Sequence, residues 1–454
     1  MVIQEGLSVF RGKRVLLLQG PVGPFFFNLA HDLRAAGAEV TKVNFNGGDH
    51  LFFPWGSTIN FRGRPEAWPE FFTSLLDQMA PDWILLFGDC RSYHRSAHTI
   101  AAQRGVGIGV FEEGYVRPDY VTLERHGVNG HSTLPRDPAF YRALPEQFID
   151  PAKPVGNTFW PAVGWAMLYY AASALLYPLF PFYKHHRPLS PLEGLPWLRS
   201  AWRHFFYAVK ERDVLSRLTG ELSGRFFLAP LQVHNDMQLS VHSGYTDVRA
   251  FINHVVDSFA RHAPQDTVLV FKNHPMDRGY HDYTRLFRQL EREHHLQGRL
   301  LYIHDQHLPT LLQHTAGVVM INSTVGMSAL YHDAPVKVTG VAIYDLPGLT
   351  FQGRLREFWC GAADFSIDKI LLRKFRGYLI RNTQLNGSFY KPLPNTRTRT
   401  GFVWARGPLN DFSLGTVHPL PIPPATSESD LISLPIQRKR RRASIYARAR
   451  SRIF

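Results

Sequence analysis

The stretch Trp83–Asp119 reads WILLFGDCRSYHRSAHTIAAQRGVGIGVFEEGYVRPD. It begins with an apolar run, Trp83–Phe87, that predicts a buried strand. An amphipathic stretch, Tyr93–Arg104, predicts a helix that ends at Gly105, and Gly107–Phe111 predicts a second strand. A strand, a helix and a strand in this order indicate a βαβ unit with parallel strands.

The same alternation extends in both directions from this stretch. Before it, the pattern predicts strands and helices at Arg14–Leu18, Phe25–Ala36, Glu39–Asn44 and Trp68–Met79. After residue 220 it returns, with strands at Phe226–Ala229, Thr267–Lys272, Leu300–Ile303, Gly317–Ile321 and Val336–Val338 and helices at Asp247–His262, Tyr280–His295, Leu308–His314 and Val325–Tyr331. The sequence therefore predicts an α/β protein of two Rossmann-like domains facing a cleft, which is a glycosyltransferase B-like arrangement.

The composition is that of a folded protein with a basic surface. Of the 454 residues, 44% are hydrophobic and 19% are charged, which excludes a disordered chain and suffices for two cores. The net charge of +14 predicts a polyanionic partner, which could be nucleic acid, anionic lipid or a phosphorylated substrate. Two distant cysteines, Cys90 and Cys360, exclude a disulfide framework and zinc-finger spacing. The first residues contain no apolar signal-peptide core, so we expect a cytoplasmic protein.

One segment is unusual because no charged residue occurs between Pro154 and Tyr183. Its longest run without proline, Ala162–Tyr177, would span roughly 24 Å as a helix, which is short of the ~30 Å hydrocarbon core of a bilayer. Three interpretations stay open. The segment is a helix at a membrane interface, which its Trp and Tyr content suits, a buried helix of the core, or a membrane span.

Four polar clusters follow predicted strands directly, which is where open α/β sheets bind their ligands. The first contains two adjacent carboxylates, Glu112 and Glu113, of which one can act as a general acid or base. Gly114 permits a close turn beside them, and Arg117 lies three residues further on. The alternative for this cluster is a helix cap with surface acids.

The second cluster offers Gln232 and Asp236. Sugar chemistry through an oxocarbenium-like transition state commonly uses two carboxylates, one as nucleophile and one as acid/base. We expect Asp236 to form such a pair with Glu112 or Glu113, provided that the groups converge across the cleft. The alternative is an ordinary turn aspartate.

The third and fourth clusters suit a phosphate group. The third consists of Lys272, His274 and Pro275, and the fourth of Asn322, Ser323 and Thr324. A histidine fixed before a rigid proline can donate to phosphate oxygens while the lysine adds charge. Hydroxyl and free N–H groups at the start of a helix also bind phosphate. The alternatives are a satisfied loop histidine and a simple helix cap.

Other ligand signatures are missing from the sequence. It contains no Asp-x-Asp pair for a metal-bridged diphosphate donor, no Walker loop and no Gly-x-Gly-x-x-Gly fingerprint. The histidine pairs His185-His186 and His294-His295 lack convincing ligand spacing. We therefore expect no metal and no cofactor.

Five motifs, in this order, resemble the capsular polysaccharide biosynthesis/export family: FEEGYVRPDY at 111–120, LQVHNDMQL at 231–239, KNHP at 272–275, INSTVGMSAL at 321–330 and VAIYDLPGLT at 341–350. The resemblance covers roughly Arg14–Thr350. Within that family the chain looks like the single-module β-Kdo transferases that start the lipid-linked oligo-Kdo linker, Kdo being 3-deoxy-D-manno-oct-2-ulosonic acid. This resemblance implies CMP-Kdo as donor, (lyso)phosphatidylglycerol as acceptor and retention of the β configuration.

The resemblance also implies residue roles. Asp236 would be the nucleophile and Glu113 the acid/base, with Glu112 beside it. His274 would hold the CMP phosphate, and Ser323 and Thr324 would complete the nucleotide site. Together with the residues beside them in the clusters, we expect a nucleotide site of His274, Pro275, Lys272, Ser323, Thr324 and Asn322, and a sugar or acceptor site of Gln232, Arg117 and Gly114. Because CMP-sialic acid transferases share these motifs more loosely, the motifs indicate a CMP-sugar more firmly than Kdo. CMP carries one phosphate, so metal is dispensable if protein groups neutralise it.

The expected partners are CMP-Kdo, a phosphatidylglycerol-type lipid, the inner membrane surface and other capsule assembly proteins, without nucleic acid. The expected location is therefore cytoplasmic and peripheral on the inner membrane. Two alternatives stay open: a transferase that uses another CMP- or UDP-sugar, and a non-enzymatic component of capsule export or assembly.

Five regions are expected on this basis. They are an N-terminal acceptor-side domain at 1–150, an apolar and basic connecting segment at 151–220, a C-terminal nucleotide-sugar domain at 221–350, a helical or irregular region at 351–418, and a basic, disordered tail at 419–454. The tail contains the run Arg438–Arg442, which could contact anionic lipid or remain solvated.

Overall fold

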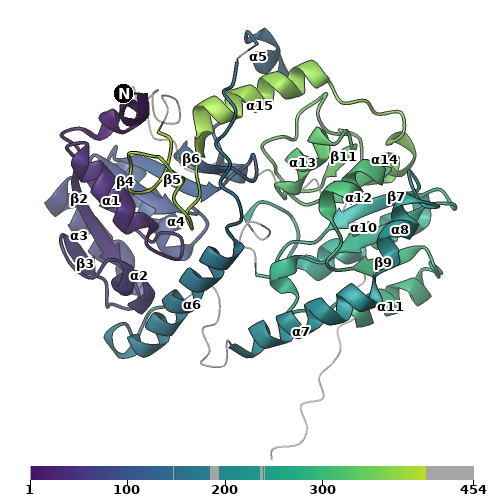
Figure 1. Ribbon diagram of the computed structural model, residues 1–454, viewed down its shortest axis with the longest axis horizontal. Coiled ribbons are helices and arrows are strands. Elements are labelled where there is room, and N and C mark those ends of the chain that lie inside the picture. Colours follow the sequence, from purple (N-terminus) through teal and green to yellow (C-terminus); the bar gives the residue numbers. More distant parts are fainter. Residues whose placement is uncertain (1, 147, 185–193, 236–238, 240, 405–454) are drawn as a thin grey trace, which may run out of the picture. The chain divides into compact units, whose positions relative to one another are not determined.

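Within residues 2–146, 148–184, 194–235, 239 and 241–404, which the computed structural model describes, the chain forms two sheets (Figure 1). The first has the strand order β12-β6-β5-β4-β1-β2-β3. Its strands are β1 (Arg14–Leu17), β2 (Glu39–Asn44), β3 (Thr58–Asn60), β4 (Trp83–Phe87), β5 (Gly107–Glu113), β6 (Tyr120–Arg125) and β12 (Gln384–Asn386). β1 to β5 pair in parallel, so their carboxyl ends meet at one edge.

Helices cover both faces of this sheet. The helices are η1 (Val2–Phe10), α1 (Phe25–Ala35), α2 (Gly47–Phe52), η2 (Pro65–Ala67), α3 (Trp68–Met79) and α4 (Ser92–Gln103). Because successive side chains in a strand point to opposite faces, Val15 and Leu17 pack with Phe25 of α1. Leu16 packs on the other face with Phe72 of α3. The predicted doubly wound α/β architecture is confirmed here.

Two antiparallel strands extend the first sheet, and the sequence analysis did not predict them. β6 pairs with β5, and β12 pairs with β6. After η3 (Asn129–His131) and α5 (Pro138–Ala143) the chain leaves this sheet, and it returns through α15 (Lys369–Thr383), which leads into β12. Phe402 and Trp404 are then buried in the first core. The region expected to be helical or irregular therefore also completes the N-terminal sheet.

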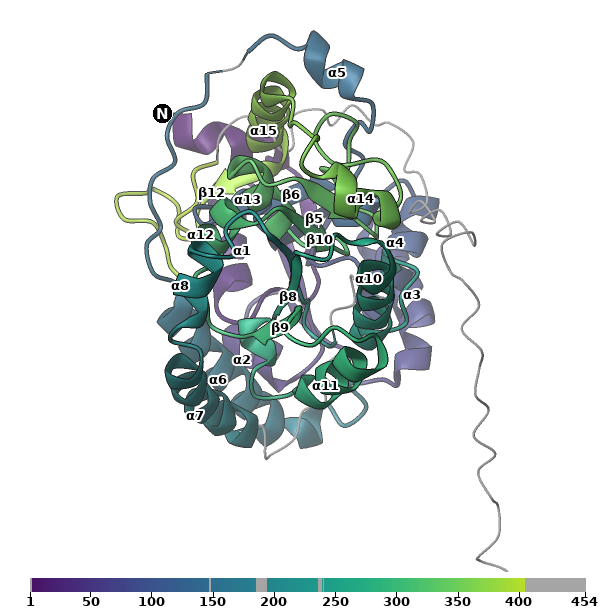
Figure 2. The ribbon, with the colours of Figure 1, turned by 90° about the vertical axis from the view of Figure 1, so that its right-hand side faces the viewer.

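The second sheet is wholly parallel, in the order β11-β10-β7-β8-β9. Its strands are β7 (Phe226–Pro230), β8 (Val268–Lys272), β9 (Leu300–Ile303), β10 (Gly317–Met320) and β11 (Val336–Val338). The helices are α8 (Val214–Thr219), α10 (Val248–His262), η5 (Pro275–Asp277), α11 (Thr284–Glu293), α12 (Leu308–His314), α13 (Val325–Tyr331) and α14 (Leu355–Gly361). Figure 2 shows α10 and α11 on one side of β8 and β9, and α8 and α12 on the other. Side chains of these two helix groups form separate cores on the two faces.

Between the sheets in sequence lie α6 (Phe159–Leu175), η4 (Tyr177–Leu179) and α7 (Gly194–Lys210). In α6 only Tyr169 and Ser173 are buried, so the interpretation as a buried core helix is wrong. Among the described residues, no helix combines the length and the apolarity that a membrane crossing requires. The interpretation as an interfacial helix stays a prediction. The basic tail, 419–454, lies outside the described residues.

Candidate functional site

The acidic pair lies at the end of β5, inside the strand. Residues 112 and 113 were expected to follow the strand, but β5 continues through them because Glu112 pairs with Thr122 and Glu113 with Val121 of β6. Successive residues of a strand point to opposite faces. Val110, two residues before Glu112, packs with the core under α3 and α4, whereas Phe111 packs with the core under α1. The two carboxylates therefore point to different faces, as the sequence indicated.

Glu112 has the environment of a proton-transfer group. Burial raises its pKa to about 7, and the charges of Glu113 and Asp89 add to this rise. Opposing this, the backbone N–H of Glu113 donates to Glu112 Oε1 at 3.0 Å, and Arg91 lies nearby. A carboxyl group whose pKa is raised toward neutrality suits general acid or base chemistry.

Glu113 is tied to a residue that the sequence analysis did not single out. The Tyr390 hydroxyl donates to Glu113 Oε1 at 2.8 Å. Burial and the neighbouring Glu113 carboxylate raise the Tyr390 pKa well above its usual value, so this tyrosine stays a donor. Tyr390 lies a few residues after β12, and no local sequence pattern predicted its contact with Glu113.

The turn after the acidic pair depends on Gly114. A Cβ at this position would lie 2.0 Å from the carbonyl oxygen of Tyr120, so a larger residue would displace β6. The backbone N–H of the next residue, Tyr115, donates to Gln384 Oε1 at 3.0 Å. Arg117 lies in the same turn and is exposed.

On the second sheet, the clusters after β7 and β10 meet. Gln232 Nε2 donates to Asn322 Oδ1 at 2.9 Å, and both residues are buried. Ser323 Oγ accepts a hydrogen bond from the backbone of Val325 at the start of α13. Thr324 occupies the cap position of that helix, and its side chain makes no cap hydrogen bond. These groups therefore share the carboxyl edge of the second sheet.

The cluster after β8 differs in part from expectation. Lys272 is buried, its ammonium donates to the carbonyl of His304 at 3.0 Å, and burial lowers its pKa. The side chain of Lys272 therefore points inward, toward the His304 carbonyl, instead of presenting its charge at the carboxyl edge of the sheet. His274 Nδ1 accepts from the backbone N–H of Met276 at 3.2 Å, and Pro275 begins η5.

The predicted nucleophile, Asp236, lies outside the described residues, as do 237, 238 and 240. Described residues before and after these positions are held in place by contacts with the second sheet domain. His234 and Asp277 form a short hydrogen-bonded pair, and Leu239 is buried in the second core. Convergence of Asp236 with the acids of β5 stays a prediction.

The sequence analysis missed a buried cluster of Asp89, Cys90, His131 and His242. Asp89 Oδ2 accepts from His131 Nδ1 at 3.1 Å and from the backbone of Val128 at 3.0 Å, and Cys90 Sγ lies 3.2 Å from Asp89 Oδ1. Burial opposes ionisation of Asp89, but its hydrogen bonds and the charge of His131 outweigh that effect, so its pKa lies below the usual range.

His242 joins this cluster from the segment after β7. Its Nε2 lies 3.5 Å from Cys90 Sγ, and its ring centre lies 4.2 Å from that of His131. Burial, reinforced by His131, lowers the His242 pKa to about 4, so the ring is neutral. The cluster thus links the carboxyl end of β4 to the segment that follows Asp236 in sequence.

Two groups of side chains among the described residues could hold a metal ion. They are Asp89, Cys90, His131 and His242, and His234, Asp277 and His281, with ligand atoms within 4.8 Å of one another in each group. The first offers one sulfur, one oxygen and two nitrogen ligands, a set that suits Zn²⁺. Its hydrogen bonds already satisfy the Asp89 carboxylate without an ion.

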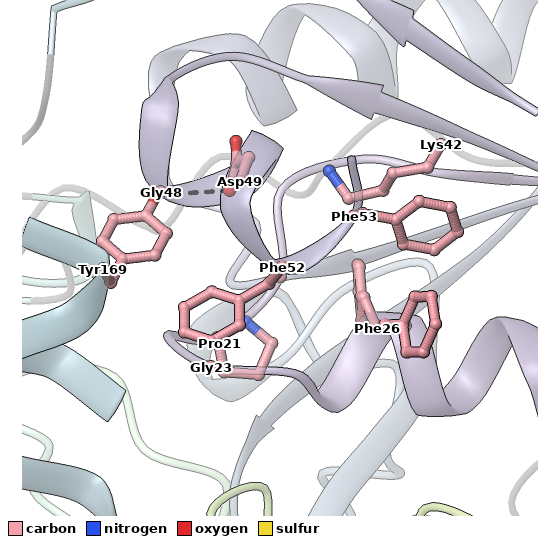
Figure 3. Close-up of a pocket in the computed structure, with 11 residues that line it drawn as sticks. Pro21, Gly23, Phe26, Lys42, Gly48, Asp49, Phe52, Phe53 and Tyr169 are labelled. Carbon is pink, nitrogen blue, oxygen red and sulfur yellow. Dashed lines mark hydrogen bonds between the residues drawn. The ribbon is translucent and has the colours of Figure 1, made fainter. Parts of the chain in front are cut away.

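A small pocket, partly open to solvent, lies beside the carboxyl end of β1 (Figure 3). Its lining combines aromatic rings with Lys42 and Asp49, and Tyr169 of α6 closes one side. Burial lowers the Lys42 pKa to about 8, and the Asp49 carboxylate opposes this shift. A Cβ on Gly48 would lie 2.6 Å from the Tyr169 ring, so α2 and α6 approach closely. The pocket therefore connects the edge of the first sheet with α6.

Comparison with known proteins places these features in a family. Residues 82–390 match the family described as capsule polysaccharide biosynthesis protein. The capsule polysaccharide export protein KpsS of Escherichia coli is 46% identical over 380 residues, which cover 84% of this chain and 97% of that protein. The capsule polysaccharide modification protein LipB of Neisseria meningitidis serogroup B is 42% identical over 396 residues, covering 85% and 94%.

Among solved structures, the β-Kdo 2,7-transferase KpsC of Thermosulfurimonas dismutans matches 82% of this chain and 92% of its own, with 14% identity and a TM-score of 0.36. A similarity of this degree says nothing about activity. The family match covers more than half of the chain, and the two curated relatives align over nearly their whole length. The chain therefore belongs to the capsule polysaccharide biosynthesis protein family.

Proposed function

We propose that this protein is a retaining glycosyltransferase that moves Kdo from CMP-Kdo to a (lyso)phosphatidylglycerol acceptor during capsule biosynthesis and export. The observation that carries the proposal is the position of the adjacent acids Glu112 and Glu113 at the carboxyl end of β5, which pairs in parallel with β4, where burial raises the Glu112 pKa. Family membership supports the capsule context. The motifs shared with CMP-sugar transferases support the donor class.

The proposed chemistry has two steps. First, an Asp236 carboxylate oxygen attacks C2 of Kdo, the bond from C2 to the phosphate oxygen breaks, and CMP leaves with the electron pair. Then the acceptor hydroxyl oxygen attacks C2, its proton passes to Glu112 or Glu113, and the Asp236 carboxylate is released. Two displacements at C2 give retention. A base with a pKa near neutrality suits the second step.

The proposal assigns the nucleotide to the edge of the second sheet. His274, Ser323 and Thr324 would bind the single phosphate of CMP through hydrogen bonds, with Asn322 held in place by Gln232. The developing charge on CMP is small enough for such donors, so the reaction is proposed to need no metal. The acceptor would reach the first sheet from the inner membrane surface, to which the protein binds peripherally beside other capsule assembly proteins.

A transfer assay tests the proposal. The purified full-length chain is incubated with CMP-Kdo and a fluorescent phosphatidylglycerol acceptor, with UDP- and CMP-linked sugars in parallel, and the lipid is analysed by mass spectrometry. We expect the acceptor to gain one Kdo residue with CMP-Kdo and with no other sugar nucleotide. We expect this transfer to persist when EDTA is added. If the lipid gains a sugar from another sugar nucleotide and none from CMP-Kdo, the proposed donor is wrong.

A second function is favoured by the name of one relative, the capsule polysaccharide export protein KpsS. In that case the protein would bind the glycolipid without catalysis. Wild-type protein that leaves CMP-Kdo and the acceptor unchanged, yet binds a Kdo-bearing glycolipid, would support this role and contradict the transferase.

A further inference from the structure

Helix α7 packs against the protein through its polar residues. Arg203 donates to the carbonyl of Arg278 at 2.8 Å and to Asp282 at 3.3 Å, and it is buried. Glu211, just past the end of the helix, accepts from the backbone N–H of His304 at 2.9 Å. Residues 203, 207 and 211 are spaced by four, so they form one inward stripe.

The opposite stripe of α7 is apolar and faces solvent. Leu198 is 71% exposed, Trp202 64%, Phe205 72% and Val209 59%. Their spacing of four, three and four residues places them on one face of the helix. Amphipathic helices of globular proteins turn such a stripe toward the core. In α7 the orientation is reversed.

Helix α6 also exposes apolar side chains, although it has no polar face. Buried hydrogen bonds hold it to the first sheet domain: the Tyr169 hydroxyl donates to Asp49 at 3.2 Å and accepts from Asn46 at 2.7 Å, and the Ser173 hydroxyl accepts from the backbone of Gly48. Its exposed large side chains are Phe159, Trp160, Met167, Leu168 and Leu175. Two successive helices therefore expose apolar side chains, each held by buried polar contacts to a different sheet domain.

The exposed charged side chains on the two helices themselves are basic. The exposed ionised side chains within α7 are Arg199 and Lys210, and α6 contains none. After α6, the guanidinium of Arg64 lies 5.2 Å from the ring centre of Phe182. Exposed tryptophan and phenylalanine with flanking basic residues are the composition that binds a membrane interface with anionic lipids.

We propose that the exposed faces of α6 and α7 together form a docking surface for an anionic phospholipid bilayer, into which Trp160, Leu168, Trp202 and Phe205 insert. This proposal deepens the membrane location given under the proposed function, since it names a second helix and the inserting residues. It does not depend on catalysis, and binding is measured without donor or acceptor turnover, so the two proposals fail separately. A second copy of the chain is the other possible occupant, and the test distinguishes the two.

Site-specific fluorescence tests the surface in the full-length chain. Cys360 is exposed and Cys90 is buried, so a Cys360→Ser background accepts an environment-sensitive nitrobenzoxadiazole label at a new cysteine. We expect the fluorescence emission of labels at Phe205→Cys and Leu168→Cys to shift to the blue when vesicles of phosphatidylcholine with phosphatidylglycerol are added. The matched control is Tyr331→Cys on α13, a residue that is 70% exposed. This label is expected to stay unchanged.

Partition measurements complete the test. Trp202→Gln with Phe205→Gln should weaken vesicle binding by at least about tenfold, while Tyr331→Gln should not change it. Arg199→Ala with Lys210→Ala should reduce the dependence on phosphatidylglycerol. Flotation without a blue shift at 205 or 168 would overturn the proposal, because the basic tail would then account for binding. A shift that needs no vesicles and grows with protein concentration would overturn it in favour of a second copy.

Discussion

The carboxyl edges of the two sheets differ in their polar groups. The edge of the first sheet holds two adjacent acids, Glu112 and Glu113, with the buried Asp89 nearby. The described edge of the second sheet presents the hydrogen-bonded amides of Gln232 and Asn322 and the paired His234 and Asp277, while its Lys272 is turned inward. One α/β architecture thus presents two adjacent acids at one edge and mainly hydrogen-bonded groups at the other. The difference suggests that the first edge carries chemistry and the second carries binding.

Replacement of Glu112 should give the largest effect. Glu112→Gln keeps the shape of the side chain but removes its proton transfer, so we expect kcat for Kdo transfer to fall by about 10²–10⁴-fold. Glu113→Gln should reduce kcat less, because Glu113 is tied to the Tyr390 hydroxyl. Glu146→Gln, which removes an exposed partner of Arg373, is the matched control and should leave kcat unchanged. If Glu113→Gln is the inactive variant, the two roles are exchanged.

The buried cluster under the first edge should matter for stability. Asp89→Ala removes the acceptor for the backbone of Val128 and for His131, so urea unfolding should show a loss of about 3 kcal/mol. The exposed Asp77→Ala loses its ion pair with Arg104 and should change the free energy of unfolding much less, because solvent screens that pair. Equal effects of the two substitutions would show that the cluster has no structural role.

At the second edge, replacement of His274 should affect binding. His274→Ala removes the proposed phosphate donor, so KM for CMP-Kdo should rise about tenfold, corresponding to ~1.4 kcal/mol, while kcat changes little. His262→Ala, exposed at the end of α10, is the control for a lost histidine. Since His274 also caps Met276, thermal unfolding of the variant should be checked. If His274→Ala lowers kcat and leaves KM unchanged, His274 acts in catalysis, and the second edge does more than bind the nucleotide.

The smallest effect concerns pH and Glu124, which lies beneath the first edge. Burial raises the Glu124 pKa to about 7, while Tyr115 and Ser132 donate to it. The folded state holds this proton at pH values where the unfolded state has lost it, so the group's stabilising contribution is lost as pH rises from about 4.5 to 7. Glu124→Gln should flatten that part of the stability curve in urea titrations at successive pH values. An unchanged curve would show that Glu124 is ionised in the fold.

Much of the fold could be predicted because local signals were strong. β4 and β9 have the predicted limits, since each is an apolar run between turns, and so does β11, whose two valines flank Lys337. β6 and β12 were missed because β12 has only three residues and forms through pairing with residues far away in sequence. β5 extends through Glu112 and Glu113 because these two residues pair with β6.

Two helices show where pattern reasoning reaches its limit. α10 and α7 both carry an apolar stripe, and α10 buries it, with Phe251, Ile252 and Val255 in the core. In α7 the stripe is exposed because Arg203 finds buried acceptors on the second sheet domain. Sequence spacing predicts the stripe in both helices, but only tertiary partners decide its direction.

The sequence predicted which candidate residues lie at strand ends, but it did not predict all the residues that contact them. Glu112, Gln232, His274 and Ser323 follow or end strands, which the strand pattern indicated. The link between Cys90 and His242 joins residues 152 apart, and no local signal predicts it. The role of Tyr390 was hidden for the same reason.

The most direct test of the account is a search for the covalent intermediate. The Glu112→Gln protein is incubated with CMP-Kdo without acceptor, and the intact protein and its peptides are weighed by mass spectrometry. The account predicts release of CMP and a protein that gains one Kdo residue on the peptide containing Asp236. Release of CMP by the wild type with transfer to lipid, but no adduct in the variant or an adduct on another peptide, would contradict it.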